Sequence, residues 1–152
     1  MFPRLKSAIH QYPRQFWLLT TVMMLAYFFH SLIWSFLLLY ISLHLDQPLS
    51  NISWLMTLNA VVGVAASFLG GAIADRFGRK GVMIFSLLLA AFGWFFFRLA
   101  GSLPVYALLM VVTGATTPVY RLTADAMVAD LVPEEKRLDA YSLLRMGNNF
   151  GV

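Results

Sequence analysis

Four long stretches of the chain contain no Asp, Glu, Lys or Arg, and short charged segments separate them. These stretches cover residues 15–45, 47–74, 81–97 and 99–120. Each approaches or exceeds the roughly 17 to 25 apolar residues that cross a bilayer as a helix. The pattern predicts an all-α membrane protein, a bundle of four complete transmembrane helices and the start of a fifth, with helices at about 16–43, 51–74, 81–99 and 104–131 and from 139 onward.

Composition supports a membrane protein. Of the 152 residues, 60% are hydrophobic and only 12% are charged, whereas soluble domains carry about 25% charged residues. The net charge of +4 does not indicate nucleic-acid binding, because the basic residues lie mostly between the predicted spans. The chain has no cysteine, which excludes disulfides and thiolate chemistry.

The distribution of basic residues predicts the topology. Lys and Arg are enriched in cytoplasmic loops, and they precede the first span, join the second to the third, and join the fourth to the fifth. The turn between the first two spans has no basic residue, and the next outer turn has only Arg98 at its edge. We therefore expect a multi-pass protein of the cell (inner) membrane with its N-terminus in the cytoplasm.

The segments between the spans contain turn and cap signals. Asn51 or Ser53 is expected to cap the second helix, and a polar loop is expected over 132–138. Gly78 is expected to take a left-handed conformation that ends the second helix.

Small and polar residues recur at every fourth position of the second span. They are Asn59, Gly63, Ser67, Gly71 and Asp75. Such a row forms one ridge of a helix, and small side chains on it allow close approach of a neighbouring helix in lipid. We call these five residues the small-residue row. The charged turn that follows it has two open interpretations: a gating element, or a turn that only fixes topology.

The residues of this turn resemble a known motif. The stretch Gly71-x-Ile73-Ala74-Asp75-Arg76-x-Gly78-Arg79-Lys80 resembles the signature loop between helices 2 and 3 of the major facilitator superfamily. The resemblance implies a conformational latch in which the acidic residue meets a helix of the opposite half of the transporter. The gating motif would then consist of Gly71, Asp75, Arg76, Gly78, Arg79 and Lys80.

A second stretch resembles the same family. Residues 130–137, from Asp130 through Pro133 to Arg137, resemble its acidic-Pro-Arg segment between helices 4 and 5. We expect Asp130 and Arg137 to form a cytoplasmic brace, with ordinary helix caps as the equally weighted alternative. The Arg-x-x-Gln-Gly pattern of proton-coupled drug antiporters is replaced here by residues 110–114, MVVTG, which weakens a drug-antiporter assignment.

Three ionisable residues lie inside predicted spans. Arg121 and Asp125 are four residues apart on one face of the fourth helix, and His30 lies near the middle of the first. Ionisable groups at such depth are costly and suggest a substrate or proton pathway; a static Arg121–Asp125 pair and a structural His30 are the alternatives. Arg145 and Asn148 face either the cavity or the cytoplasmic interface.

These features together predict a secondary active transporter. The expected function is proton-coupled export of small organic solutes by alternating access, in which the missing C-terminal half of the same transporter and membrane lipid are partners. Residues 1–152 would be the N-terminal part of the first six-helix half. A non-transporting scaffold or sensor with the same fold is the alternative. An enzyme is not expected, because no convergent nucleophile, carboxylate pair or metal site is visible in the sequence, and we expect no cofactor.

Overall fold

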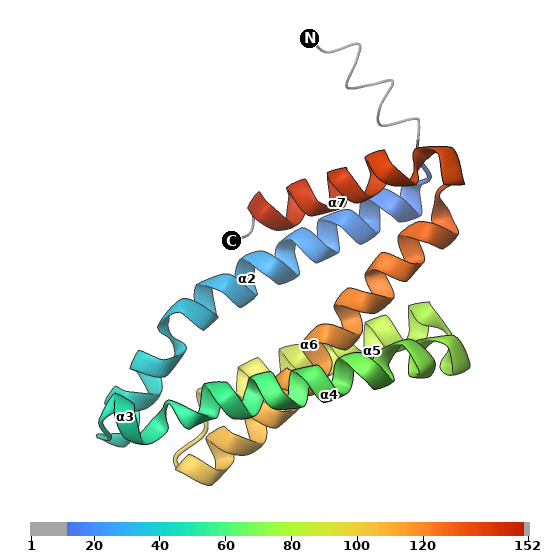
Figure 1. Cartoon of the computed structure of the whole chain (residues 1–152). Coiled ribbons are helices and arrows are strands. Elements are labelled where there is room, and N and C mark those ends of the chain that lie inside the picture. Colours follow the sequence, from blue (N-terminus) through green and yellow to red (C-terminus); the bar gives the residue numbers. More distant parts are fainter. Residues whose placement is uncertain (1–11, 151–152) are drawn as a thin grey trace. The chain divides into compact units, whose positions relative to one another are not determined.

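The computed structural model describes residues 12–150, and all regular structure within that range is helical (Figure 1). The elements are the α-helices α2 (Arg14–Leu45), α3 (Leu49–Ile52), α4 (Trp54–Phe77), α5 (Arg79–Phe97), α6 (Leu103–Leu131) and α7 (Arg137–Phe150), and the 3₁₀ turn η1 (Glu134–Lys136).

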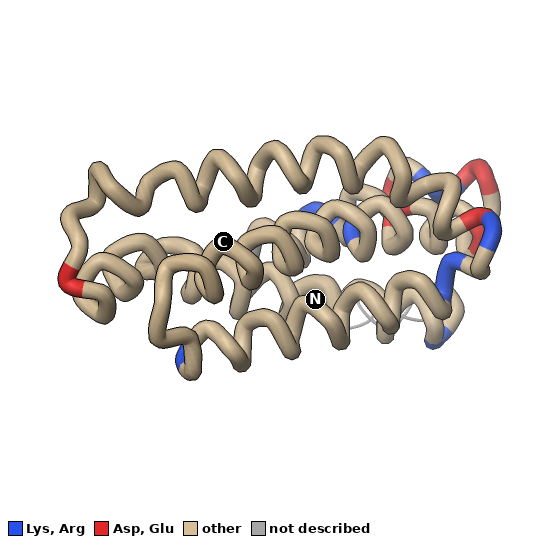
Figure 2. Tube along the Cα trace, turned by 90° about the horizontal axis from the view of Figure 1, so that it is seen from below, with Lys and Arg blue, Asp and Glu red and all other residues tan. Residues whose placement is uncertain are grey.

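Four segments are long and apolar enough to cross a membrane. They are Arg14–Leu45, Leu49–Phe77, Arg79–Phe97 and Leu103–Leu131. Figure 2 shows that charged residues lie mainly near helix ends, with long uncharged stretches between them. The four spans predicted from sequence are therefore confirmed, with boundaries shifted by a few residues.

Two local expectations differ from the structure in part. Ser53, one of the two expected candidates, is the N-cap residue of α4, but it makes no side-chain cap bond, and its hydroxyl donates to the Ser50 carbonyl oxygen at 3.3 Å. The region 132–138 is not a continuous loop, because η1 and the start of α7 occupy most of it. The cause of the second difference is that Glu134, Glu135 and Asp139 are favourable in the first turns of helices.

Packing divides the chain into two units. The first holds the chain up to Ile33 together with the part from Asp125 onward, and the second is Trp34–Ala124. Helices α2 and α6 contribute to both units.

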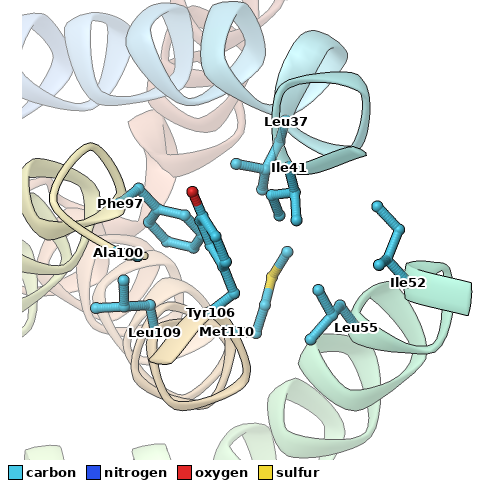
Figure 3. Close-up of a cluster of buried hydrophobic side chains, with 9 residues drawn as sticks. All are labelled: Leu37, Ile41, Ile52, Leu55, Phe97, Ala100, Tyr106, Leu109 and Met110. Atoms are coloured by element: carbon cyan, nitrogen blue, oxygen red, sulfur yellow. The ribbon is translucent and has the colours of Figure 1, made fainter. Parts of the chain in front are cut away.

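The second unit has an apolar core at one end of its helices (Figure 3). Tyr106 and Met110 of α6 lie among side chains of the other helices, and the aromatic rings of Tyr106 and Phe97 have centroids 5.9 Å apart. The buried members are Leu37, Ile41, Ile52, Leu55, Phe97, Ala100, Tyr106, Leu109 and Met110. This cluster joins the end of α2, α3, α4, α5 and α6 beside the turns at 46–48 and 98–102.

Close contact between α4 and α6 continues beyond this cluster. A Cβ built on Gly114 would lie 2.6 Å from the Asn59 carbonyl oxygen, and one on Gly63 would lie 3.4 Å from the Gly114 carbonyl oxygen. On the other side of α6, a Cβ on Gly93 of α5 would lie 3.1 Å from the Thr113 methyl group. Small residues therefore bring three helices together, as expected where lipid provides no hydrophobic driving force between helices.

The first unit packs the beginning of α2 against α7. Gly147 of α7 lies against Thr20 and Met24 of α2, with a Cβ position 3.4 Å from the Thr20 methyl group. The rings of Tyr12 and Phe16 pack in a tilted arrangement with centroids 4.7 Å apart. Burial raises the pKa of the Tyr12 hydroxyl, and the negative charge of Asp139 raises it further.

Candidate functional site

The turn between α4 and α5 consists of one residue, Gly78. Its φ of +88° and ψ of 124° lie in a region that side-chain-bearing residues rarely adopt. The φ is positive, as the expected left-handed conformation requires, but the ψ differs from that of a left-handed helical residue. Because the turn is so short, Asp75 at the end of α4 and Arg79 at the start of α5 lie close together. The Arg79 Nη2 and Asp75 Oδ1 atoms are 3.1 Å apart, and Arg79 Nε also donates to the same oxygen at 3.3 Å.

This ion pair is accessible. The Asp75 side chain is 66% exposed and that of Arg79 is 34% exposed, so the net energy of the pair is small, about 0 to 1 kcal/mol. Arg76 lies over the ring of Phe77, with its guanidinium carbon 5.5 Å from the ring centroid. The turn thus holds Asp75 in place through a weak contact that a stronger partner can replace.

The small-residue row has two different environments. Asn59 and Gly63 face α6, as described above, whereas Ser67, Gly71 and Asp75 are exposed. A Cβ on Gly71 would meet no atom within 4 Å among the described residues. The end of the row nearest the charged turn therefore presents an open strip of small residues.

Asn59 makes a contact that the sequence did not predict. Its side-chain Nδ2 donates to the Met110 carbonyl oxygen at 2.9 Å and to Thr113 Oγ1 at 3.1 Å. Thr113 Oγ1 itself donates to the Leu109 carbonyl oxygen at 2.9 Å, so its hydroxyl both accepts and donates. An asparagine within an apolar span was the available signal, but sequence alone does not identify the helix that an amide side chain will bond.

Arg137 binds the end of α6. Its Nη2 donates to the Ala129 carbonyl oxygen at 2.9 Å and its Nε to that of Val132 at 3.3 Å. These bonds satisfy carbonyl groups that have no partner within the last turn of a helix. Asp130 is exposed in the same turn. The geometry thus gives Arg137 a capping role, while a brace between Asp130 and Arg137 stays a prediction.

The three expected pathway residues are distributed over both units. His30 belongs to the first unit, on α2, and Arg121 to the second, on α6; both side chains are half-buried. Asp125 lies one helical turn after Arg121 and belongs to the first unit, where it is exposed. Their participation in one pathway stays a prediction.

Asp125 lines a groove of about 440 Å³ with residues of α7. The Tyr141 hydroxyl donates to the Asp125 carbonyl oxygen at 3.0 Å, and the positive charge of Arg145 is near enough to interact with the Asp125 carboxylate. Leu138 and Ser142 complete the lining. Tyr141 and Ser142 were not predicted as site residues, although Tyr141 and Arg145 are four residues apart and so share one face of α7.

Residues 12–150 contain no group of three or more His, Asp or Glu side chains arranged to hold a metal ion. The described chain is thus characterised by spanning helices, one short charged turn and polar groups between helices. These features define an integral, multi-pass membrane protein.

Comparison with known proteins identifies the family. The model of the Major Facilitator Superfamily matches residues 19–152. The chain is 30% identical over 121 residues to the MFS-type transporter YqjV of Bacillus subtilis, covering 77% of this chain and 28% of that protein. The chain belongs to the major facilitator superfamily, which confirms the resemblance seen in the sequence.

The names of two further relatives state different substrates. A Na⁺, Li⁺, K⁺/H⁺ antiporter of Planococcus maritimus is 28% identical over 126 residues, covering 80% of this chain and 29% of that protein. A protein of Bacillus subtilis named as a candidate niacin/nicotinamide transporter, NiaP, is 33% identical over 98 residues, covering 63% and 24%. The chain spans less than a third of the length of these relatives. No solved structure matched it.

Proposed function

We propose that the chain is the N-terminal part of a secondary active transporter that exports small organic solutes in exchange for protons by alternating access. Its superfamily and the transporter names of its relatives support the general class. The name of one relative includes proton exchange and that of another a small organic solute, which supports the finer assignment. In this proposal the protein is a transporter and not an enzyme.

The observation that carries the proposal is the exposed Asp75 at the end of an open strip of small residues. Ser67 and Gly71 leave space for a further helix beside α4, and Asp75 makes a solvent-accessible pair with Arg79. A helix that packs on this strip in one state of the cycle would bring a positive group or a helix N-terminus to Asp75. Separation of that helix would return Asp75 to Arg79.

The other charged groups have supporting roles in this proposal. Asp130 and Arg137 brace the junction of α6 and α7, and Arg137 holds the last carbonyl groups of α6. His30, Arg121 and Asp125 line the substrate or proton pathway. The basic residues on both sides of the α4–α5 turn support a cytoplasmic location for it, and in this proposal the N-terminus lies on the same side of the inner membrane.

The test is transport by the protein expressed from its full reading frame, in inverted membrane vesicles with and without a proton gradient. We expect Asp75→Asn to reduce gradient-driven transport at least ten-fold, because the amide keeps the size of the side chain but lacks the charge. Asp46→Asn is the matched control: Asp46 has a φ of +51°, which asparagine also tolerates, and it lies in the turn at the other end of the spans. Unchanged transport in Asp75→Asn would contradict the gating role.

A second substitution tests the pathway. Arg121→Met removes the charge within α6 and keeps an unbranched apolar side chain, so the membrane abundance of the protein should be retained while transport is lost. Transport at the original rate would exclude a direct role for Arg121. A protein with the α4–α5 turn intact whose accessibility does not change when substrate is added would instead be a scaffold or sensor.

A further inference from the structure

A groove of about 540 Å³ lies between α4, α5 and α6 in the second unit. Large apolar side chains of α4 and α5 form its sides, and small residues of all three helices leave its floor open. The lining residues are Ala66, Leu69, Ile73, Phe77, Gly81, Val82, Phe85, Ser86, Ala115, Thr116 and Val119. We call this space the α4–α5–α6 groove.

The groove lies within helices that are apolar enough to span a membrane. Leu69, Phe77 and Phe85 on its sides are each more than 60% exposed. A Cβ on Gly81 would meet no atom within 4 Å among the described residues, so the floor is unfilled there. Space of this shape between spanning helices suits a hydrocarbon chain.

Basic residues lie next to one end of the groove. Phe77 and Gly81 line that end and flank the α4–α5 turn, next in sequence to Arg76 and Lys80. Residues 75–80, on both sides of this turn, include three basic residues and one acidic residue, and the acidic residue, Asp75, is paired with Arg79. Arg76 stays beside the groove through its contact with the Phe77 ring. The end therefore offers two exposed cations, Arg76 and Lys80, at the edge of an apolar space.

We propose that the α4–α5–α6 groove binds an anionic phospholipid, with an acyl chain between the helices and the phosphate held by Arg76 and Lys80. The charge decides the occupant: a helix packed into the groove would satisfy its apolar walls but leave the two cations without anionic partners. Basic residues near a membrane surface contribute about 1 kcal/mol each to the binding of anionic lipid, which corresponds to about five-fold in affinity. This lipid site does not depend on the transport function proposed above.

The experiment uses the full-length protein in nanodiscs that contain phosphatidylglycerol or phosphatidylcholine with the same photoreactive diazirine acyl chain. After irradiation, mass spectrometry measures the labelling of peptides from 66–86 and 115–119. We expect phosphatidylglycerol to label these peptides at least five-fold more strongly than phosphatidylcholine, with the difference reduced at high salt because screening weakens exposed charges.

Two pairs of variants locate the site. A Cβ at Gly81 meets no atom within 4 Å in the described chain, so Gly81→Leu should fill part of the groove and abolish the labelling. Gly101, which is equally open at the Cβ position, lies outside the groove, so Gly101→Leu should retain the labelling. Lys80→Gln should lower labelling by phosphatidylglycerol about five-fold. Arg98→Gln, at the other end of α5, should leave it unchanged. Elution of each variant as a single peak in size-exclusion chromatography controls for folding.

Three outcomes would overturn the proposal. Equal labelling by the two lipids would mean that the groove contacts lipid without recognising the headgroup. Labelling that persists in Gly81→Leu would place the acyl chain elsewhere. Absence of labelling by either lipid would show that another part of the full-length protein covers the groove.

Discussion

The two halves of α4 carry the same row of small and polar residues but have different neighbours. In the first half, Asn59 bonds to α6 and Gly63 lies against the Gly114 backbone. In the second half, Ser67 bonds within its own helix, to the Gly63 carbonyl oxygen at 2.8 Å, and a Cβ on Gly71 would meet no atom of residues 12–150 within 4 Å. Equal spacing in sequence thus produces a fixed helix contact in one half and an unoccupied strip in the other.

A row of small residues therefore does not by itself identify a packed interface. A partner helix has to approach, and in the first half it does so because α6 offers Gly114 and Thr113 at the matching level. Gly70 and Ala74 show that the second half of α4 also packs, but through a neighbouring face, against Val119. The row is therefore turned away from α6 as α4 approaches the charged turn.

The largest change in stability is expected for Gly114→Ala, which tests the packed half of α4. Gly114→Ala would place a methyl carbon 2.6 Å from the Asn59 carbonyl oxygen, a backbone atom that cannot move without shifting α4. We expect it to destabilise the protein by about 2 to 3 kcal/mol. Unfolding in mixed micelles with increasing SDS measures the change.

The control for this prediction is Gly71→Ala, because a Cβ there meets nothing within 4 Å. Alanine is a better helix former than glycine, so this variant should be neutral or more stable by about 0.5 to 1 kcal/mol. Equal effects of the two substitutions would show that the halves of α4 do not differ in packing.

A smaller effect is expected at the turn. Gly78→Ala forces a side chain into a backbone with φ of +88°, which costs about 1 to 2 kcal/mol. Space is not the cause, since a Cβ at this position would also meet no atom within 4 Å in the described chain. The same unfolding measurement checks this, with Gly81→Ala as a control at a glycine of ordinary φ. No loss of stability in Gly78→Ala would mean that the turn readily adopts another conformation.

The spans and the turn could be predicted from sequence for a physical reason. The length of an apolar run determines whether a helix can cross the bilayer, and the Gly78 turn follows from local backbone preference. The bonds of Asn59 to Met110 and Thr113 could not be predicted, because they depend on which helices meet and at what level. The N-cap position of Ser53 could be predicted, but the bond of its hydroxyl could not, because a serine hydroxyl has several carbonyl groups within reach and here it bonds to Ser50.

The polar contact between α4 and α6 should have a moderate effect. Asn59→Leu removes the bonds to the Met110 carbonyl oxygen and to Thr113 Oγ1, and bonds of this kind between membrane helices contribute about 0.6 to 1.7 kcal/mol. Thr113→Val should be less harmful in the Asn59→Leu background than alone, and a double-mutant cycle measures that coupling. Ser67→Ala, in the other half of the row, removes only a bond within α4 and should be neutral. Additive effects of Asn59→Leu and Thr113→Val would exclude a direct bond between the two residues.

The smallest effect on stability is expected at Asp75, where the proposed effect on transport is large. Asp75→Asn breaks an exposed ion pair between residues four apart, and such pairs contribute less than about 0.5 kcal/mol. Unfolding in SDS should therefore hardly change, while gradient-driven transport falls. If stability and transport fell together, Asp75 would support the fold like Asn59 in the other half of the row. If stability is preserved and transport is lost, Asp75 makes its important contact in another state of the transport cycle. Asp75→Asn in an Arg79→Gln background should then cause no further loss of stability.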